Sequence, residues 1–282
     1  MSPIRTTALV ALCAALAVSA CRRNEEAPAA PPPEAQPKAD VVPADQAAPL
    51  TYERTTEYAE VSLTLPEAVA RHRDLHATLY GEAAENLREF LGGAQSDQTE
   101  YGGEALPTYF RRIDWALDAE TGKLVALSSE TDEYTGGAHG MQVYGAVLWD
   151  KALDRRIQPT ALFRRGADMG VLDRALCEAI NAARTARTGE PSALTVGDPS
   201  AAWACPRAMG TAFTLEPSRT GGKAGGLEFL INPYVVGPYA EGAYRIVVPQ
   251  SAFRTLLAPA YADEFAGEPQ RSGDVTPQPQ AE

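Results

Sequence analysis

The stretch ETDEYTGGAHG, residues 130–140, separates two runs in which polar and apolar residues alternate. Residues 108–137, which include the first part of this stretch, give two alternating runs joined by DAETGK, whose acids and glycine suit a hairpin loop. After it, residues 142–149 alternate again, and a short strand is expected around Arg156 and Ile157. Alternation with a period of two is typical of strands half buried in an antiparallel sheet. The stretch therefore connects runs that are predicted to form strands of a largely antiparallel arrangement.

Helices are expected on both sides of this region in the sequence. Residues 58–65 alternate as a strand, and residues 66–94 then carry apolar side chains at helical spacing, with Pro66 at the start and Gly92-Gly93 as a stop. Residues 167–187 carry a second helix-spaced apolar stripe. Two further strands and a short helical piece are expected at residues 226–236, 242–249 and 251–257. The predicted fold class is α+β: one or more largely antiparallel sheets with helices packed on one face, arranged as one domain or as two interlocked subdomains.

The N-terminus has the features of a secretory signal. Arg5 is followed by an apolar run over residues 8–18, which is too short to cross a bilayer, and then by small residues before Cys21. These residues resemble the bacterial lipoprotein cleavage box, so residues 1–20 are interpreted as signal peptide and Cys21 as the lipidated residue; a plain signal with an incidental cysteine is the alternative. Acyl chains on Cys21 would anchor the protein to a membrane. Arg22, in place of an acid, favours the outer membrane, facing the periplasm.

Composition divides the rest of the chain. Residues 21–50 are rich in proline and alanine and predict a disordered tether, and residues 267–282 predict a disordered tail. The chain has 37 acidic and 25 basic residues and a net charge of −12. This charge argues against a nucleic-acid partner and suits a cationic one. Cys13 lies in the predicted signal peptide and Cys21 is the predicted lipidation site, which leaves Cys177 and Cys205. In an oxidising compartment these two cysteines are expected to form a disulfide.

Two motifs carry a family resemblance. YTGGAHG, followed by VLWDKALDRRIQPTALF, and later NPYVVGPYAEGAYRIVVP, resemble in order the extracellular domain of the anti-sigma factor RsiV and the accessory domain of the peptidoglycan deacetylase PdaC. The resemblance is placed on residues 113–266, with residues 51–112 as a strand and helix subdomain that matches more loosely. It implies an α+β domain near the cell wall and, in RsiV, a surface that binds lysozyme. It does not imply catalysis.

His139 is the sharpest candidate for chemistry. The glycines before it indicate a backbone with positive φ or a close approach, so a structural turn, a ligand-facing surface and a catalytic or metal role all remain open. NPYVVGPYAEG offers large, semi-polar tyrosines as interface anchors, or as caps of the core. The candidate ligand-binding residues are Tyr134, Gly136, Gly137, His139, Tyr234, Pro238 and Tyr239.

The leading hypothesis is an envelope lipoprotein with a non-catalytic domain that binds a lysozyme-like muramidase or peptidoglycan. One alternative is a peptidoglycan hydrolase that uses Glu130, Asp132, Glu133 and His139, and another is a purely structural lipoprotein. His72 and His76 have the i, i+4 spacing of a zinc site, but HRDLH lacks the glutamate of a protease motif and is interpreted as an exposed polar helix face. No cofactor, metal or catalytic residue is expected.

Overall fold

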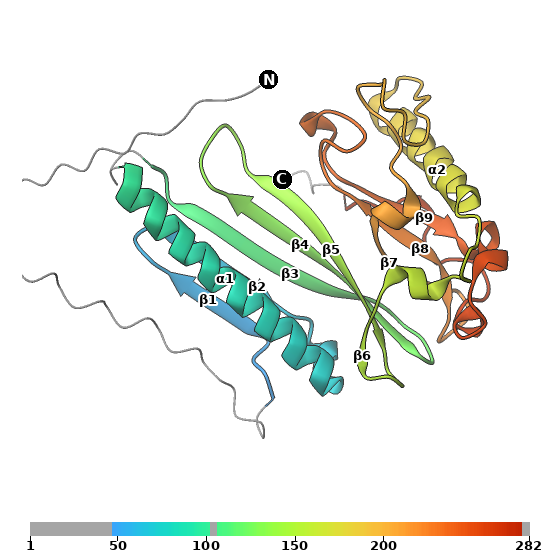
Figure 1. The fold of residues 1–282 in the computed structure, drawn as a ribbon, viewed down its shortest axis with the longest axis horizontal. Coiled ribbons are helices and arrows are strands. Elements are labelled where there is room, and N and C mark those ends of the chain that lie inside the picture. Colours follow the sequence, from blue (N-terminus) through green and yellow to red (C-terminus); the bar gives the residue numbers. More distant parts are fainter. Residues whose placement is uncertain (1–46, 102–105, 278–282) are drawn as a thin grey trace, which may run out of the picture. The chain divides into compact units, whose positions relative to one another are not determined.

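The computed structural model describes residues 47–101 and 106–277. Ten strands form two sheets within this part of the chain, and two long helices cover them (Figure 1). The six-stranded sheet has the order β1-β2-β3-β4-β5-β6 and the four-stranded sheet has the order β10-β9-β8-β7. The α+β class with mostly antiparallel strands is confirmed.

The first sheet consists of β1 (Thr51–Thr55), β2 (Ala59–Thr64), β3 (Tyr109–Glu120), β4 (Leu124–Tyr134), β5 (Met141–Asp150) and β6 (Arg155–Ile157). The second consists of β7 (Ala212–Pro217), β8 (Ala224–Ile231), β9 (Tyr244–Pro249) and β10 (Gly273–Asp274). The helices are α1 (Arg73–Tyr101) and α2 (Gly170–Thr188). Short 3-10 turns complete the elements: Glu67–Arg71, Pro159–Leu162, Ala208–Gly210, Tyr239–Glu241, Gln250–Ala252, Arg254–Leu256 and Ala262–Glu264.

Helix α1 connects the one parallel strand pair among the described elements, β2 and β3. A parallel pair needs a long crossover, and a helix supplies it. Its buried residues recur every three or four positions, as in Leu75, Leu79 and Leu87, and pack against β2 and β3. The predicted stop at Gly92-Gly93 is wrong, because the helix continues to Tyr101. Burial of Ala94 and Gln98 offsets the cost of two helical glycines.

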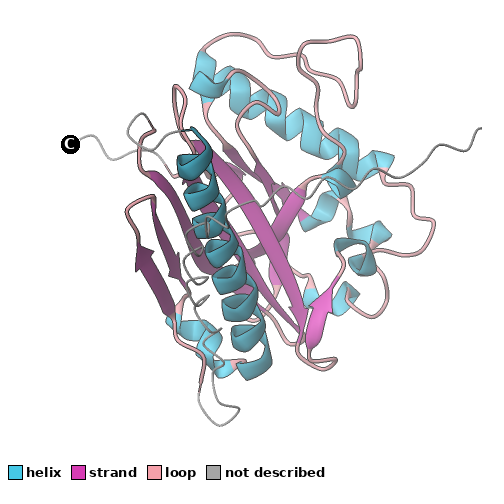
Figure 2. Ribbon diagram, turned by 60° about the vertical axis from the view of Figure 1, so that its left-hand side comes forward, coloured by secondary structure: helices cyan, strands magenta, loops and turns pink. Residues whose placement is uncertain are grey.

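Strand β4 separates two hydrophobic cores. Its residues alternate between them: Leu124 and Ala126 belong to the core shared with the second sheet and α2, whereas Val125 and Leu127 belong to the core under α1. β7 packs against β3, β4 and β5 from the second sheet, and α2 contacts β9 and β10. The order of layers is therefore α1, first sheet, second sheet, α2, and Figure 2 shows the helices against the strands from another side.

The C-terminal segment differs from the predicted tail. Residues 267–277 lie against the second sheet, and β10 pairs with β9 at its edge. Arg271 explains the difference, since its guanidinium binds Glu216 at 2.6 Å and Glu228 at 2.6 Å, two side chains with no solvent exposure. Two buried carboxylates need a cation, and the tail provides it.

Other boundaries shift slightly. Strands β1 and β7 were not predicted. Of the expected tether, residues 47–50 are described, and Leu50 accepts a hydrogen bond from the Leu65 amide at 2.8 Å. The expected division between residues 112 and 113 falls inside β3. The predicted signal peptide, Cys21 and residues 21–46 of the tether lie outside the described residues.

Candidate functional site

The structure brings the two sequence motifs together, although they are about a hundred positions apart in the chain. YTGGAHG forms the loop between β4 and β5, and NPYVVGPYAEG forms the loop between β8 and β9. The His139 ring stacks on Tyr239 with centroids 3.9 Å apart, and its Nε2 lies 3.2 Å from the hydroxyl of Tyr234. Tyr234 and Tyr239 are themselves in ring contact at 5.4 Å. We call His139, Tyr234 and Tyr239 the aromatic cluster.

Main-chain contacts fix the aromatic cluster in place. The Gly140 carbonyl accepts a hydrogen bond from the Tyr239 hydroxyl at 2.8 Å and lies 2.8 Å from His139 Nδ1. The Tyr134 hydroxyl donates to the Gly137 carbonyl at 3.0 Å, which closes the β4–β5 loop on itself. These contacts hold His139 in the local arrangement of a structural turn and also place its ring at the surface.

The glycines of the first motif meet demands that other residues would strain. Gly136 and Gly137 have φ values of 95° and 94°, a region that L side chains rarely adopt. A Cβ on Gly140 would lie 2.9 Å from the Glu133 carbonyl oxygen. The sequence argument that these glycines answer a backbone requirement is therefore confirmed.

Tyr234 is unusual in both conformation and exposure. Its φ is 68°, which is uncommon for a bulky residue, and its side chain is 46% exposed. Its neighbour Val235 is 39% exposed. Strained residues persist where the surrounding structure holds them, and they concentrate at functional sites. Tyr234 thus presents a large ring to solvent in a conformation that the loop imposes.

Helix α2 anchors the β8–β9 loop through Glu241, which the sequence analysis did not identify. Arg184 donates to both Glu241 oxygens, at 2.9 and 2.7 Å, and the Tyr244 hydroxyl donates at 2.8 Å. The hydrogen bonds from Arg184 hold the pKa of Glu241 below its ordinary value. Arg187 donates to the carbonyls of Glu241 and Ala243, each at 2.7 Å. The acid within GPYAEG was the one sequence signal for this anchor.

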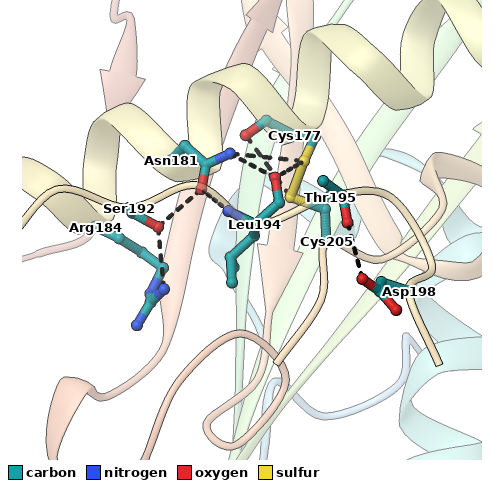
Figure 3. The surroundings of a disulfide bond; sticks show 8 residues. All are labelled: Cys177, Asn181, Arg184, Ser192, Leu194, Thr195, Asp198 and Cys205. Atoms are coloured by element: carbon teal, nitrogen blue, oxygen red, sulfur yellow. Dashed lines mark hydrogen bonds between the residues drawn. A yellow bond between two sulfur atoms is a disulfide. The ribbon is translucent and has the colours of Figure 1, made fainter. Parts of the chain in front are cut away.

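The predicted disulfide supports the same helix. Cys177 on α2 is bonded to Cys205, and the Cα atoms are 5.4 Å apart. Beside it, Asn181 binds the main chain of Leu194 and the Ser192 hydroxyl, and Ser192 accepts from Arg184 at 3.0 Å (Figure 3). The segment after α2 is thereby fixed to the helix, and Arg184 is oriented toward Glu241.

The acids of the first motif do not converge on His139. Glu133 pairs with Arg111 on the α1 side of the sheet, while Glu130 and Asp132 occupy the opposite face because alternate strand residues point to opposite sides. Glu130 accepts a hydrogen bond from Gln142. Within the described ranges, no carboxylate is hydrogen-bonded to His139, and no group of three or more potential ligands is placed to hold a metal ion.

His72 and His76 differ from the sequence interpretation. His72 ends a 3-10 turn with φ −116° and ψ 80°, whereas His76 lies within α1, so the two do not share a helix face. His76 is 2% exposed, and its Nε2 lies 3.0 Å from the Pro49 carbonyl. His72 lies 3.5 Å from Glu120. The expected exposed polar face is wrong, because His76 fastens residues that precede β1 to the core.

The fold and site define an α+β domain with an aromatic surface where two loops meet. Residues 52–142 match the family model described as Deacetylase PdaC, so this part of the chain is similar to that family. The match includes β1 to β4, the start of β5 and the loop of His139, and it begins well before residue 113, where the sequence resemblance placed the family-like region.

Two solved structures are similar to the chain. A DUF3298 family member from Bacteroides fragilis has 18% identity and a TM-score of 0.48, with coverage of 73% of this chain and 88% of its own. A DUF3298 family protein from Pseudomonas aeruginosa has 15% identity and a TM-score of 0.49, with coverage of 78% and 99%. No curated protein matches the chain. Among the described helices, none combines the length and apolar character that a membrane span requires.

Proposed function

We propose that this protein is an envelope lipoprotein whose domain binds a cell-wall-related ligand, either a lysozyme-like muramidase or peptidoglycan, without catalysing a reaction. The observation that supports the proposal most is Tyr234, an exposed ring held at positive φ beside His139 and Tyr239. Tyrosines give large contact areas with a polar end and are enriched among residues that dominate binding energy. The net charge of −12 suits a cationic muramidase, because complementary fields accelerate encounter.

The test is a calorimetric titration of the protein with lysozyme and, separately, with soluble peptidoglycan fragments. The double variant His139→Ala/Tyr234→Ala is expected to weaken binding of the true ligand by about tenfold or more, because both substitutions remove ring contacts at the centre of the surface. Tyr101→Ala is the matched control, since Tyr101 is 66% exposed at the end of α1. The proposal fails in this form if neither ligand binds the parent protein at micromolar concentrations.

The membrane anchor is tested separately from the ligand. We expect Cys21→Ala to release the protein from the membrane fraction of cells and to abolish the mass increase of lipidation, because the acyl chains are the proposed anchor. Ligand binding by the domain should not change. Recovery of the variant in the membrane fraction would contradict the proposed anchoring.

A further inference from the structure

Arg187, in the last turn of α2, binds two separate segments of the chain with one guanidinium group. Its Nη1 donates to the carbonyls of Glu241 and Ala243, each at 2.7 Å. Its Nη2 donates to Asp274 Oδ2 at 2.6 Å and to Thr276 Oγ1 at 3.1 Å. The first two acceptors belong to the β8–β9 loop, whereas the other two belong to β10 and the residues that follow it. Arg187 therefore connects the loop of the aromatic cluster to the C-terminal end of the described chain.

The chemistry of the guanidinium makes this connection stiff. Each Nη carries two hydrogens, so all four Nη hydrogens of Arg187 have an acceptor. The group is planar, and its nitrogens keep a fixed arrangement relative to one another. The Tyr244 ring supports it, with the ring centroid 3.6 Å from the guanidinium carbon. The positions of the two sets of acceptors are therefore coupled through one rigid group.

A short hydrogen-bonded turn links these loop carbonyls to the aromatic cluster. The 3-10 turn Tyr239–Glu241 is closed by a hydrogen bond from the Gly242 N–H to the Tyr239 carbonyl at 2.8 Å. Gly242, with φ 72°, lies between the two residues whose carbonyls Arg187 binds. The Tyr239 ring at the start of this turn stacks on His139. The position of Arg187 thus influences how the Tyr239 ring is presented.

The C-terminal segment, residues 268–277, is attached to the fold mainly by polar contacts. Among these described residues, only Pro269 is buried. The Val275 N–H donates to the Arg245 carbonyl at 2.8 Å, and the Arg245 N–H donates to the Thr276 hydroxyl oxygen at 2.8 Å. Segments with little apolar burial open locally at a lower free-energy cost than the protein unfolds as a whole. We therefore expect this segment to detach from the second sheet before the cores are disrupted.

We infer that the C-terminal segment controls the aromatic cluster through Arg187, so that Arg187 and Asp274 are positioning residues of the binding surface. When the segment is attached, Asp274 and Thr276 hold the guanidinium in the orientation that fixes the β8–β9 loop. When the segment detaches, Nη2 loses both acceptors, the Arg187 side chain gains freedom, and its hold on the loop carbonyls weakens. The consequence for ligand binding rests on the proposed function, whereas the coupling between segment and loop does not.

The experiment is hydrogen exchange of the full chain, followed by NMR at the amides of Glu241 and Gly242. The double variant Asp274→Ala/Thr276→Ala removes both acceptors of Arg187 Nη2 and leaves the sequence of the loop unchanged. It is expected to speed exchange of these two amides by about tenfold, because hydrogen bonds to a charged group are lost. The ring resonances of His139 should shift in the same variant.

Two further variants and a matched control accompany this measurement. Arg187→Lys keeps the charge but has one nitrogen in place of the planar fork, so it should also speed exchange of the loop amides. Thr276→Ser keeps the hydroxyl and should leave their exchange rates within about twofold of the parent. The control Glu268→Ala/Ser272→Ala removes a carboxylate and a hydroxyl from exposed positions of the same segment, and it should change the rates less than twofold.

The inference is overturned if Asp274→Ala/Thr276→Ala speeds exchange of the Val275 amide while the loop amides and the His139 resonances stay unchanged, since the segment would then detach without effect on the loop. Equal effects of this variant and the control would overturn it as well. If amides of α1 also exchange faster, the variant has lost global stability, and Thr276→Ala alone replaces it with the same expected direction.

Titration with lysozyme and with soluble peptidoglycan fragments separates this inference from the proposed function. Weaker binding by Asp274→Ala/Thr276→Ala, with parent-like binding by Glu268→Ala/Ser272→Ala, supports the positioning role in ligand binding. Unchanged binding despite faster exchange of the loop amides rejects that role. If the parent protein binds neither ligand, the proposed function fails and the exchange measurement alone decides whether the segment controls the loop.

Discussion

At the scale of single residues, Gly237 shows why the second motif needs its first glycine. A Cβ at this position would overlap the Glu241 carboxylate. That carboxylate accepts the hydrogen bonds of Arg184 and Tyr244 that hold the loop of Tyr234 and Tyr239. The glycine therefore provides room for an ion pair, in addition to any backbone freedom that it allows.

We expect Gly237→Ala to destabilise the protein by about 2 kcal/mol, because the new methyl group displaces Glu241 from Arg184 in a site where both are largely buried. Gly81→Ala is the control: it lies within α1 with nothing inside 4 Å, so it should stabilise by up to about 1 kcal/mol. Urea unfolding followed by circular dichroism measures both. Equal effects of the two substitutions would contradict the role assigned to Gly237.

Asp118 links the two sheets and makes stability depend on pH. Arg245 on β9 binds Asp118 at 3.1 Å and also pairs with the buried Glu228, while Ser128 on β4 donates to Asp118 at 3.0 Å. Burial is the main reason that the pKa of Asp118 rises to about 6, and Glu228 adds to the rise although Arg245 opposes it. The folded state therefore retains a proton that the unfolded state has lost between about pH 4 and pH 6.

The stabilisation from protonated Asp118 is full below about pH 4 and is lost as the pH rises through 6. Asp118→Asn lacks this titration, so the free energy of unfolding of the parent protein, relative to the variant, should fall by up to about 3 kcal/mol from pH 4 to pH 7. Urea unfolding of both proteins across this range measures the difference, in which the contributions of other acids cancel. A difference that stays constant with pH would show that Asp118 does not titrate there.

At the scale of elements, the sequence predicted those whose burial follows a simple period. Strand β2 alternates between buried and more exposed residues, and α2 carries Leu172, Leu176 and Ile180 at helical spacing, so each was found near its observed position. β1 was missed because it is a short polar edge strand with one buried residue. Strand β7 was missed because both of its faces are buried although alternate residues are polar. Thr214 and Glu216 are as buried as Phe213 and Leu215, so the sequence pattern does not indicate how deeply the strand lies.

The sequence predicted residues that form the candidate site, but not the residues that hold them in place. YTGGAHG and NPYVVGPYAEG were identified as motifs, and the structure brings His139, Tyr234 and Tyr239 into contact. Arg184 was not identified, because an arginine on the polar side of a helix has no sequence feature that distinguishes a buried ion pair from solvent exposure. The same limit explains why the C-terminal segment was predicted as disordered, since only the fold shows that Arg271 reaches buried acids.

Strand β10 and its flanking residues depend on that arginine. We expect Arg271→Ala to destabilise the protein by about 3 kcal/mol, because it leaves Glu216 buried without a cation. Arg165→Ala, at an exposed position, should change stability by less than about 0.5 kcal/mol. Thermal unfolding measures both, and hydrogen exchange of residues 268–277 reports whether the segment detaches. Retained stability in Arg271→Ala would contradict the importance of this ion pair.

At the scale of the whole molecule, β3, β4 and β5 contribute to both hydrophobic cores. Strand β4 supplies Leu127 to the core under α1 and Leu124 to the core with the second sheet. A separation at residue 112 would divide β3, whose partners are β2 on one side and β4 on the other. The described part of the chain is therefore joined through shared strands, which favours a cooperative unit over independent subdomains.

We expect a single unfolding transition in calorimetry, because each core requires the same strands. Leu79→Ala in the core under α1 and Phe229→Ala in the other core should each lower the midpoint of that one transition, with losses of about 3 to 5 kcal/mol for these fully buried side chains. Two resolved transitions, each sensitive to only one substitution, would show that the sheets unfold separately.

Asn232 has a consequence for how copies of this protein behave near one another. Its side-chain oxygen accepts a hydrogen bond from the main-chain N–H of Tyr144 at 2.8 Å. The Tyr239 hydroxyl donates a hydrogen bond to the carbonyl of Gly140, the residue just before β5. β6 pairs only with the last residues of β5, so the first part of that edge of β5 has no neighbouring strand among the described elements. An open strand edge can pair with another chain, and these two hydrogen bonds cover part of it. The loop that presents the tyrosines thus also covers part of the open edge of β5, and we expect this to reduce edge-to-edge pairing where many copies crowd together.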